Sequence, residues 1–519
     1  MLFMDYKKLF DRILWYFIIP FTALSFITVK LTNDTRIFIG VEAIADRFYS
    51  FPYGWDSAYE VKPIGNRIWN WIFYKFADFF SPMVLNHYTE FGWFVKGLAL
   101  IILIVCCYYI SKKIVFPYAF PILFISFACE ANFGLLMSEW WGALFSLVAV
   151  AMIMGAKPSD KPLLEYVDKG GYWKDTLREN GLPFLAGIFF IFIGLLKGIT
   201  ILLIIPTVCA VYLLGYKIKW VPAIVGFLSG GFAFISCCFA IWPYAISDIL
   251  LSRLVAHVGQ HDPITLIYWF WITQARTNLP MVMWVYLPAV LIGAFAGLWG
   301  LLHYCSKGKY KQAFLFSAMW LCPIVMIFIQ SEFIVYHYCV LLVPSIISIV
   351  ILLKTIKPKW QTALVIIGLI FAGYLVINSA IGSYSIYEYT FWHQKEIDAD
   401  TINAQFDLIN QTSILYLDPG DAPYYFQSNS SCRYIAPMPV ERSTPEWNIT
   451  YTDAFKEDYA CILAYQGDYI VADISSHQDI GYFGEGIADR KPIMDMIANN
   501  YTKVSDNSWA IYQHKGLVK

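Results

Sequence analysis

The chain has 519 residues, of which 58% are hydrophobic and only 14% are charged, and its mean hydropathy is +0.55. Because a soluble protein carries about a quarter charged residues, this composition argues against an ordinary soluble enzyme and predicts a membrane protein. The formal net charge is −1. That balance gives no electrostatic reason to expect a nucleic-acid partner, and we expect none.

The apolar residues fall in blocks that are long enough to cross a bilayer. A helix needs about 20 apolar residues to cross the hydrocarbon core, and inside lipid the backbone must satisfy its own hydrogen bonds. We divide 183–215 at Lys197-Gly198, because a lysine in the middle of the bilayer is costly. The sequence then predicts about eleven spans, at 13–30, 95–110, 115–130, 137–154, 183–196, 199–215, 221–246, 281–303, 313–329, 334–353 and 362–381.

Lysine and arginine in the short loops predict the orientation of these spans. With the N-terminus in the cytosol, every cytosolic loop is basic, whereas the short outer turns carry almost no positive charge. This orientation predicts a multi-pass protein of the plasma membrane, or of an endomembrane if the host is eukaryotic. Asn-x-Ser/Thr triplets, which N-glycosylation uses, all lie on the predicted outer side, at Asn33, Asn410, Asn429, Asn448 and Asn500.

The first outer segment, 31–94, is too long for a turn and is rich in aromatic residues. Its stretch Ile68–Phe80 is apolar with few charges, which predicts one or two helices lying along the membrane surface. The outer segment 247–280 has a similar composition.

The chain becomes polar from about residue 382. Short β-like runs occur there, separated by turn signals, and a helix is predicted at Ile493–Asn499. The runs are Ser413–Leu417, Tyr469–Ala472 and Ala510–Gln513. We therefore predict a transmembrane domain of residues 1–381 and a small extracytoplasmic α/β domain of residues 382–519. The outer compartment permits a disulfide between Cys432 and Cys461, a pairing that the sequence alone leaves open.

Four groups of polar residues lie at predicted outer ends of spans, where buried charge is costly and is usually retained for a function. Each has a plainer interpretation as well, such as loop charges that pair with lipid headgroups or a lysine that extends to the interface. Their common side of the membrane predicts one outward-facing site for an anionic ligand. The groups are Glu42, Asp46, Asp56, Glu60, Lys62 and Arg67 in the first loop, then Glu139, then Lys197, then His337 with Tyr338.

Four short motifs follow one another along the chain: Glu60-Val61-Lys62-Pro63, Ser138-Glu139, Leu196-Lys197-Gly198, and His337-Tyr338 with Pro344. In this order, with a long first outer loop, many spans and an outer C-terminal domain, they resemble the GT-C-type glycosyltransferases. The chain is most similar to the branch of the protein O-mannosyltransferases and the aminoarabinose transferases of lipid A. The family's acidic pair early in the first loop has its nearest counterpart in Val41-Glu42, with Asp46 one helical turn further on.

The resemblance implies a transferase that moves a hexose or pentose from a polyprenyl-phosphate donor, such as dolichyl or undecaprenyl phosphate, to a hydroxyl of a glycan, lipid or protein. Glu42, Asp46 or Asp56 would be the catalytic base. The donor phosphate would be held by Lys62, Arg67, Lys197 and His337. The acceptor pocket, or a site for the divalent metal that some relatives use, would be formed by Glu60, Glu139 and Tyr338.

Two other classes of function compete with this interpretation. A transporter or flippase of a lipid-linked glycan precursor would favour repeated halves and interrupted helices at the middle of the membrane. The sequence contains no such repeat, and its charges lie near the predicted outer surface. A membrane-anchored binding or assembly protein would leave the charges at the helix ends unexplained.

Overall fold

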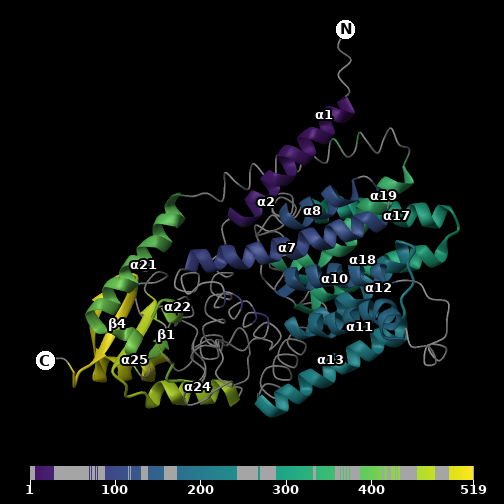
Figure 1. The fold of residues 1–519 in the computed structure, drawn as a ribbon. Helices are drawn as coiled ribbons and strands as arrows, with labels where there is room; N and C mark the ends of the chain where they lie inside the picture. The colour runs from purple at the N-terminus through teal and green to yellow at the C-terminus, as the bar shows by residue number, and fades with distance from the viewer. Residues whose placement is uncertain are drawn as a thin grey trace, which may run out of the picture. The chain divides into compact units, whose positions relative to one another are not determined.

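The computed structural model is mostly helical (Figure 1). The chain divides into two compact units. The first contains Met1–Thr32, Val95–Ile235 and His261–Ser383, and the second contains Asn33–Phe94, Ser236–Gln260 and Tyr384–Lys519. The structure describes residues 6–28, 69, 72, 76, 79, 88–114, 116, 118–129, 138–156, 172–241, 267–268, 288–330, 335–356, 363, 366, 370, 373, 386–411, 414–417, 422–426, 428, 430–432, 453–473 and 490–517.

The first unit is built from apolar helices. In chain order they are α1 (Tyr6–Ile13), the π-helix η1 (Leu14–Ile18), α2 (Ile19–Thr28), α7 (Tyr88–Ile114), α8 (Ala119–Cys129), α10 (Ser138–Gly155), α11 (Tyr172–Leu196), the 3₁₀ helix η5 (Gly198–Leu203), α12 (Ile204–Leu213), α13 (Trp220–Ile241), α17 (Pro288–Ser306), α18 (Tyr310–Gln330), the 3₁₀ helix η7 (Val335–Leu341) and α19 (Leu342–Thr355). The first residues of α7 and the last of α13 belong to the second unit.

Six helices are long and apolar enough to cross a membrane: Phe94–Ile114, Ser138–Gly155, Glu179–Leu196, Pro288–Ser306, Tyr310–Ile329 and His337–Thr355. They coincide with six of the predicted spans and make the chain a multi-pass membrane protein. Shorter apolar helices occupy the predicted spans at 115–130, 199–215 and 221–246. The predicted total of eleven spans stays a prediction, because most of 362–381 lies outside the described residues.

Helix α10 lies in the core of the first unit, where it packs against α11, α12, η5 and η7. Almost all of its residues are buried, as expected for a helix that is apolar around its whole circumference. Other helices expose large apolar side chains, including Phe232, Phe295 and Phe314, each more than 70% exposed. Exposed apolar surface on this scale suits contact with lipid rather than with water.

Two helices of this unit approach so closely that their backbones touch. A Cβ atom added to Gly187 of α11 would collide with the carbonyl group of Ala223 in α13. In the same way, a Cβ atom at Gly226 of α13 would collide with the carbonyl group of Phe184 in α11. Small residues at helix crossings let apolar helices associate by close backbone packing in a membrane.

The C-terminal part of the second unit contains a four-stranded sheet with the strand order β1-β2-β4-β3. The strands are β1 (Leu415–Leu417), β2 (Tyr469–Asp473), β3 (Tyr501–Asp506) and β4 (Trp509–His514). β1 pairs parallel to β2, whereas β4 pairs antiparallel to both β2 and β3. The accompanying helices are α21 (Ile386–Phe406), the 3₁₀ helix η8 (Leu408–Asn410), α22 (Ala422–Phe426), α24 (Asp453–Ala464) and α25 (Arg490–Asn500).

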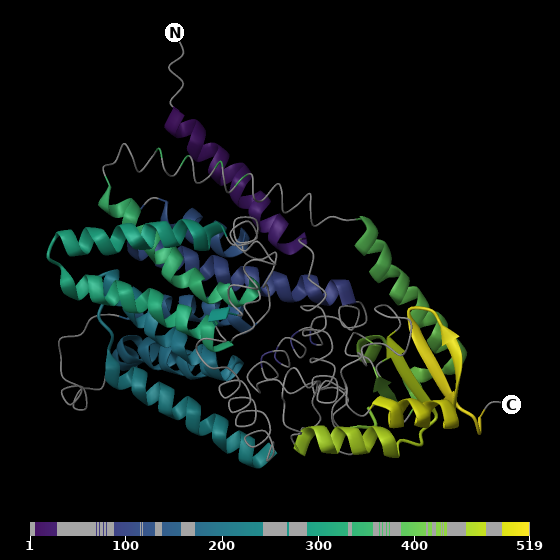
Figure 2. The same ribbon diagram turned by 180° about the vertical axis from the view of Figure 1, so that it is seen from behind.

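Alternate residues of the strands form two separate hydrophobic clusters, one on each face of the sheet. Tyr416, Val471 and Ile511 pack on the face covered by α21 and α22. Leu415, Ile470 and Ala510 pack on the face covered by α24 and α25. Figure 2 shows α21 and α25 beside this sheet from the reverse view. A disulfide between Cys432 and Cys461 ties α24 to the segment that follows α22.

The small sheet and its helices agree with the predicted elements in this part of the chain. The predicted strands at 413–417, 469–472 and 510–513 correspond to β1, β2 and β4, and the predicted helix at 493–499 lies within α25. β3 was not predicted. The proposed surface helices at 31–94 and 247–280 fall almost wholly outside the described residues, and the boundary at 381/382 stays a prediction.

Candidate functional site

Glu139 is a carboxylate buried in the first turn of α10, where its side chain is only 2% exposed. Trp140 and Trp141 follow it and are also buried. Tryptophan side chains next to a helix end exclude water from that end, so the carboxylate depends on protein groups to offset its charge.

Lys197 lies at the break between α11, which ends at Leu196, and η5, which begins at Gly198. Its backbone is extended, with φ −158° and ψ 122°. The backbone N–H of Thr200 donates to the Lys197 carbonyl oxygen at 2.7 Å, and the Thr200 hydroxyl lies 2.6 Å from the same oxygen. That hydroxyl also contacts the Ile193 carbonyl oxygen. The break predicted at Lys197-Gly198 is therefore confirmed, and Thr200 fixes it.

His337 lies in η7, directly before α19, and its side chain is completely buried. Its neighbour Tyr338 is 6% exposed. A 3₁₀ helix is tighter than an α-helix, and η7 packs against α10, α17, α18 and α19. This packing places the imidazole of His337 beside the first turn of α10.

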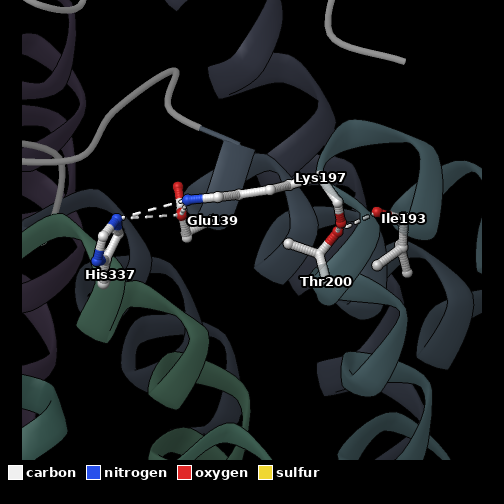
Figure 3. A network of polar contacts seen from close by, with 5 residues as sticks. All are labelled: Glu139, Ile193, Lys197, Thr200 and His337. Carbon is white, nitrogen blue, oxygen red and sulfur yellow. Dashed lines mark hydrogen bonds and ion pairs between the residues drawn. The ribbon is translucent and has the colours of Figure 1, made fainter. Parts of the chain in front are cut away.

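The three side chains meet at one oxygen atom, as Figure 3 shows. The ammonium nitrogen Nζ of Lys197 donates to Oε1 of Glu139 at 2.7 Å. Nε2 of His337 lies 3.6 Å from the same oxygen and 3.5 Å from Nζ of Lys197. We call Glu139, Lys197 and His337 the ionic cluster. It joins the start of one helix, the break after a second and the entry to a third.

The ionic cluster lies at one end of the spans that supply it. Glu139 is the second residue of α10, Lys197 follows the last residue of α11, and His337 precedes α19. The other end of the span-length part of α11, Glu179–Leu196, carries a separate ion pair, in which Nζ of Lys219 lies 3.9 Å from Oε2 of Glu179. At 1.5 Å per residue, the 18 residues of Glu179–Leu196 place the two ion pairs about 27 Å apart along α11. The cluster therefore lies at one end of the span, not at its middle.

Exposure differs sharply within the ionic cluster. The Lys197 side chain is 28% exposed, whereas those of Glu139 and His337 are 2% and 0% exposed. An ammonium group has three N–H donors, and the bond to Glu139 uses one of them. A ligand that approaches the cluster from its exposed side would thus contact Lys197 first, because the Glu139 carboxylate lies buried behind the ammonium group. The arrangement can receive an anion.

The structure brings together three of the residues selected from the sequence and describes a fourth, Tyr338, next to one of them. The remaining candidates lie outside the part of the chain that the structure describes: Glu42, Asp46, Asp56, Glu60, Lys62 and Arg67. The sequence analysis missed Thr200, although a threonine three residues after the end of a helix is a common hydrogen-bond partner of the carbonyl group at that end. Within the described residues, no group of three His, Cys, Asp or Glu side chains could hold a metal ion.

No family model and no curated protein matches this chain. Among solved structures it is similar to an oligosaccharyltransferase of Archaeoglobus fulgidus. The structure tethered to an acceptor peptide with an NVT sequon has a TM-score of 0.47 and 12% identity, over 97% of this chain and 75% of that one. The structure with an inhibitory peptide and a dolichol-phosphate has a TM-score of 0.39 and 12% identity, over 97% and 74%. The structure with zinc and sulfate has a TM-score of 0.39 and 14% identity, over 88% and 68%.

These structural neighbours are membrane glycosyltransferases of the GT-C type. All of these TM-scores are below 0.5.

Proposed function

We propose that the chain is a glycosyltransferase that moves a sugar from a polyprenyl-phosphate donor to a hydroxyl acceptor at the outer face of the membrane. The observation that carries the proposal is the ionic cluster, a partly exposed lysine held between two buried ionisable groups at the end of three spans. Buried charge in a membrane domain is expensive and is usually functional. The short motifs that resemble those of the GT-C enzymes indicate that the reaction is transfer of a sugar.

Side chains of the chain can account for every proton and charge in the proposed reaction. The acceptor oxygen attacks the anomeric carbon, the bond from that carbon to the phosphate oxygen breaks, and its electron pair leaves with the phosphate. A first-loop carboxylate, Glu42, Asp46 or Asp56, takes the hydroxyl proton, an assistance worth roughly 10²–10⁴-fold in rate. Lys62, Arg67 and Lys197 stabilise the negative charge that develops on the phosphate. His337, whose side chain is completely buried 3.5 Å from Nζ of Lys197, acts through that lysine.

The acceptor would bind beside Glu60 and Tyr338. The described residues do not favour a metal in the ionic cluster, because Oε1 of Glu139 already contacts an ammonium group.

The cluster is proposed to face the outside of the cell. Lysines gather at the ends of the helices away from it, at Lys354 in α19 and at Lys217 and Lys219 after α12, and lysine-rich ends favour the cytosol. The disulfide in the C-terminal part agrees with an oxidising outer compartment. The N-terminus would then be cytosolic.

Labelling of Cys305 tests this orientation. Cys305 is an exposed thiol in the last turn of α17, beside the lysine-rich turn that follows. A maleimide that cannot cross membranes should label it only after the cells are permeabilised, with Cys305→Ser as the control for the other thiols. Labelling of Cys305 in intact cells would show that this end of α17 faces outward, the opposite of the proposed orientation.

Transfer itself is tested with purified protein in lipid nanodiscs. The protein is incubated with a panel of radiolabelled polyprenyl-phosphate sugars and an extract of cell-surface acceptors, and transferred label is counted. We expect transfer from at least one donor and its loss in Lys197→Met, with Lys217→Met as an exposed control. Movement of intact donor across liposome membranes without transfer would instead support a flippase.

A further inference from the structure

Glu139 is poorly placed for direct contact with a substrate. Its side chain is 2% exposed, and its Oε1 oxygen is already engaged by Lys197 and faces His337. A general base must reach the proton that it accepts, at a distance of about 2.6–3.2 Å or through one water molecule. The accessible member of the cluster is Lys197, so Glu139 acts behind it.

Lys197 is held at both ends. Thr200 binds its backbone carbonyl oxygen, and Glu139 binds its ammonium group at 2.7 Å. Figure 3 shows the lysine side chain extended between these two anchors. A free lysine side chain has several rotatable bonds, and fixing them costs conformational entropy. The two anchors supply that ordering before any ligand arrives.

We propose that Glu139 is a positioning residue that holds the ammonium group of Lys197 ready to bind the donor phosphate. The proposal rests on the proposed function, because it specifies the role of one residue in the same donor site. It moves Glu139 from the acceptor or metal pocket, where the sequence had placed it, to the phosphate side. Preorganised donors are effective because they need not reorganise when charge develops in the reaction.

The consequence of losing Glu139 follows from burial. Without Glu139, the ammonium would keep only the longer contact of 3.5 Å to Nε2 of His337 among the contacts described above, in a poorly hydrated site. The lysine side chain is partly exposed and flexible, so it would turn toward water or headgroups instead. Glu139→Leu removes the acceptor completely, whereas Glu139→Gln leaves an amide oxygen in its place. The two variants should therefore form a graded series.

The experiment is a double-mutant cycle on binding of a short-chain polyprenyl monophosphate to the full-length protein in nanodiscs. Loss of one charge-assisted contact corresponds to about a tenfold to hundredfold weaker binding. We expect this loss in Glu139→Leu and a smaller one in Glu139→Gln. The double variant Glu139→Leu/Lys197→Met should bind no more weakly than Lys197→Met alone, because Glu139 acts only through the lysine.

The same variants are then assayed for transfer. A positioning role predicts a higher KM for the donor and an unchanged KM for the acceptor, a division that general damage to the fold would not produce. The matched control is the ion pair at the other end of the span Glu179–Leu196, with Glu179→Leu, Lys219→Met and their double variant. These should leave binding of the monophosphate unchanged.

Several results would overturn the proposal. Tighter phosphate binding in Glu139→Leu would mean that removing a negative charge matters more than losing the position. Losses that multiply in the double variant, or a raised acceptor KM, would place Glu139 in contact with a substrate of its own. If Glu139→Leu does not fold, the cycle built on Glu139→Gln decides the question.

Failure of this inference is distinct from failure of the proposed function. Wild-type protein that binds the monophosphate with the expected coupling but transfers no sugar would refute the glycosyltransferase proposal alone. Wild-type protein that transfers sugar while Glu139 and Lys197 contribute independently would refute the positioning role alone.

Discussion

Removing Lys197 and removing the charge of Glu139 should destabilise the fold by different amounts, although the two residues form one ion pair. In Lys197→Met, the Glu139 carboxylate keeps its buried position with a side chain 2% exposed. It loses its ammonium partner at 2.7 Å and keeps only Nε2 of His337, at 3.6 Å from the same oxygen. Loss of one partner from a buried pair costs about 3–5 kcal/mol. In Glu139→Gln, the lysine can turn outward from its 28% exposed position. That variant should lose only about 1–2 kcal/mol, the worth of a partly exposed charged hydrogen bond.

The assay is unfolding of the full-length protein in mixed micelles, followed by its loss of helix content as denaturant increases. The expected difference between the two variants is about 2 kcal/mol, which is large beside the accuracy of such midpoints. Glu179→Gln and Lys219→Met provide the control, because that pair has a distance of 3.9 Å and both side chains are partly exposed. Each should cost less than about 1 kcal/mol.

The result that would refute this reasoning is the reverse order, in which Glu139→Gln is the more destabilised variant. Equal losses would also contradict it, because they would mean that the exposed part of Lys197 gives the ammonium no route to water. Either result would show that the cluster is sealed on the lysine side as well, and the assignment of Lys197 as the anion-facing group would fail.

Three further predictions concern other parts of the molecule. Opening the disulfide with Cys432→Ser and Cys461→Ser should cost about 3–4 kcal/mol for a separation of 29 residues, measured by denaturation with and without reductant; equal stability in both conditions would mean that the bond does not form. Gly226→Ala should destabilise the fold by about 1–3 kcal/mol, because the added Cβ would collide with backbone atoms of α11. In Gly231→Ala on the same helix, the added Cβ makes only ordinary van der Waals contacts, so this variant should be neutral or stabilising in thermal unfolding. Burial, with a smaller contribution from Asp468, raises the pKa of Tyr501 to about 12. The stability that the neutral phenol of Tyr501 contributes is therefore complete below about pH 10 and is lost as the pH rises toward 12. Tyr501→Phe should flatten the fall of the denaturation midpoint between these pH values, and an unchanged slope would contradict the raised pKa.

The spans were predictable because their signal is local. A block of apolar residues has to satisfy its own backbone, and a lysine at mid-bilayer is too costly to be tolerated. The same rule predicted the break at Lys197-Gly198, which the structure shows between α11 and η5. The 3₁₀ form of η5 could not be predicted, because it depends on the contacts of Thr200 with carbonyl groups before the break.

The partners within the ionic cluster lie beyond what one sequence can specify. Lys197 is 58 positions from Glu139 and 140 positions from His337. The sequence placed all three residues on one side of the membrane, but helix packing decides which of them touch. The carboxylate was assigned to an acceptor or metal pocket because nothing local to Ser138-Glu139 indicates a lysine on another helix.

β3 was missed for a reason that its burial makes clear. Tyr501 is the one buried residue of this strand, and all of its other residues are exposed or half-buried. An edge strand with a single buried position gives almost no alternating pattern, and the register shift between Lys503 and Ser505 interrupts what remains. β2 and β4 were found because their apolar side chains fill both clusters of the core.

Stability alone does not explain why the ionic cluster exists. Apolar side chains of similar volume in place of a buried ion pair are often neutral, or stabilising by about 1–4 kcal/mol. Most of the rest of α10 is already apolar and buried, so this fold could have had apolar side chains at the end of the helix as well. The variant Glu139→Leu/Lys197→Met should therefore unfold at a denaturant concentration at least as high as wild type while it loses binding of the donor phosphate. A double variant that is strongly destabilised would show instead that the charges serve the fold, and the strongest physical argument for a functional site here would be lost.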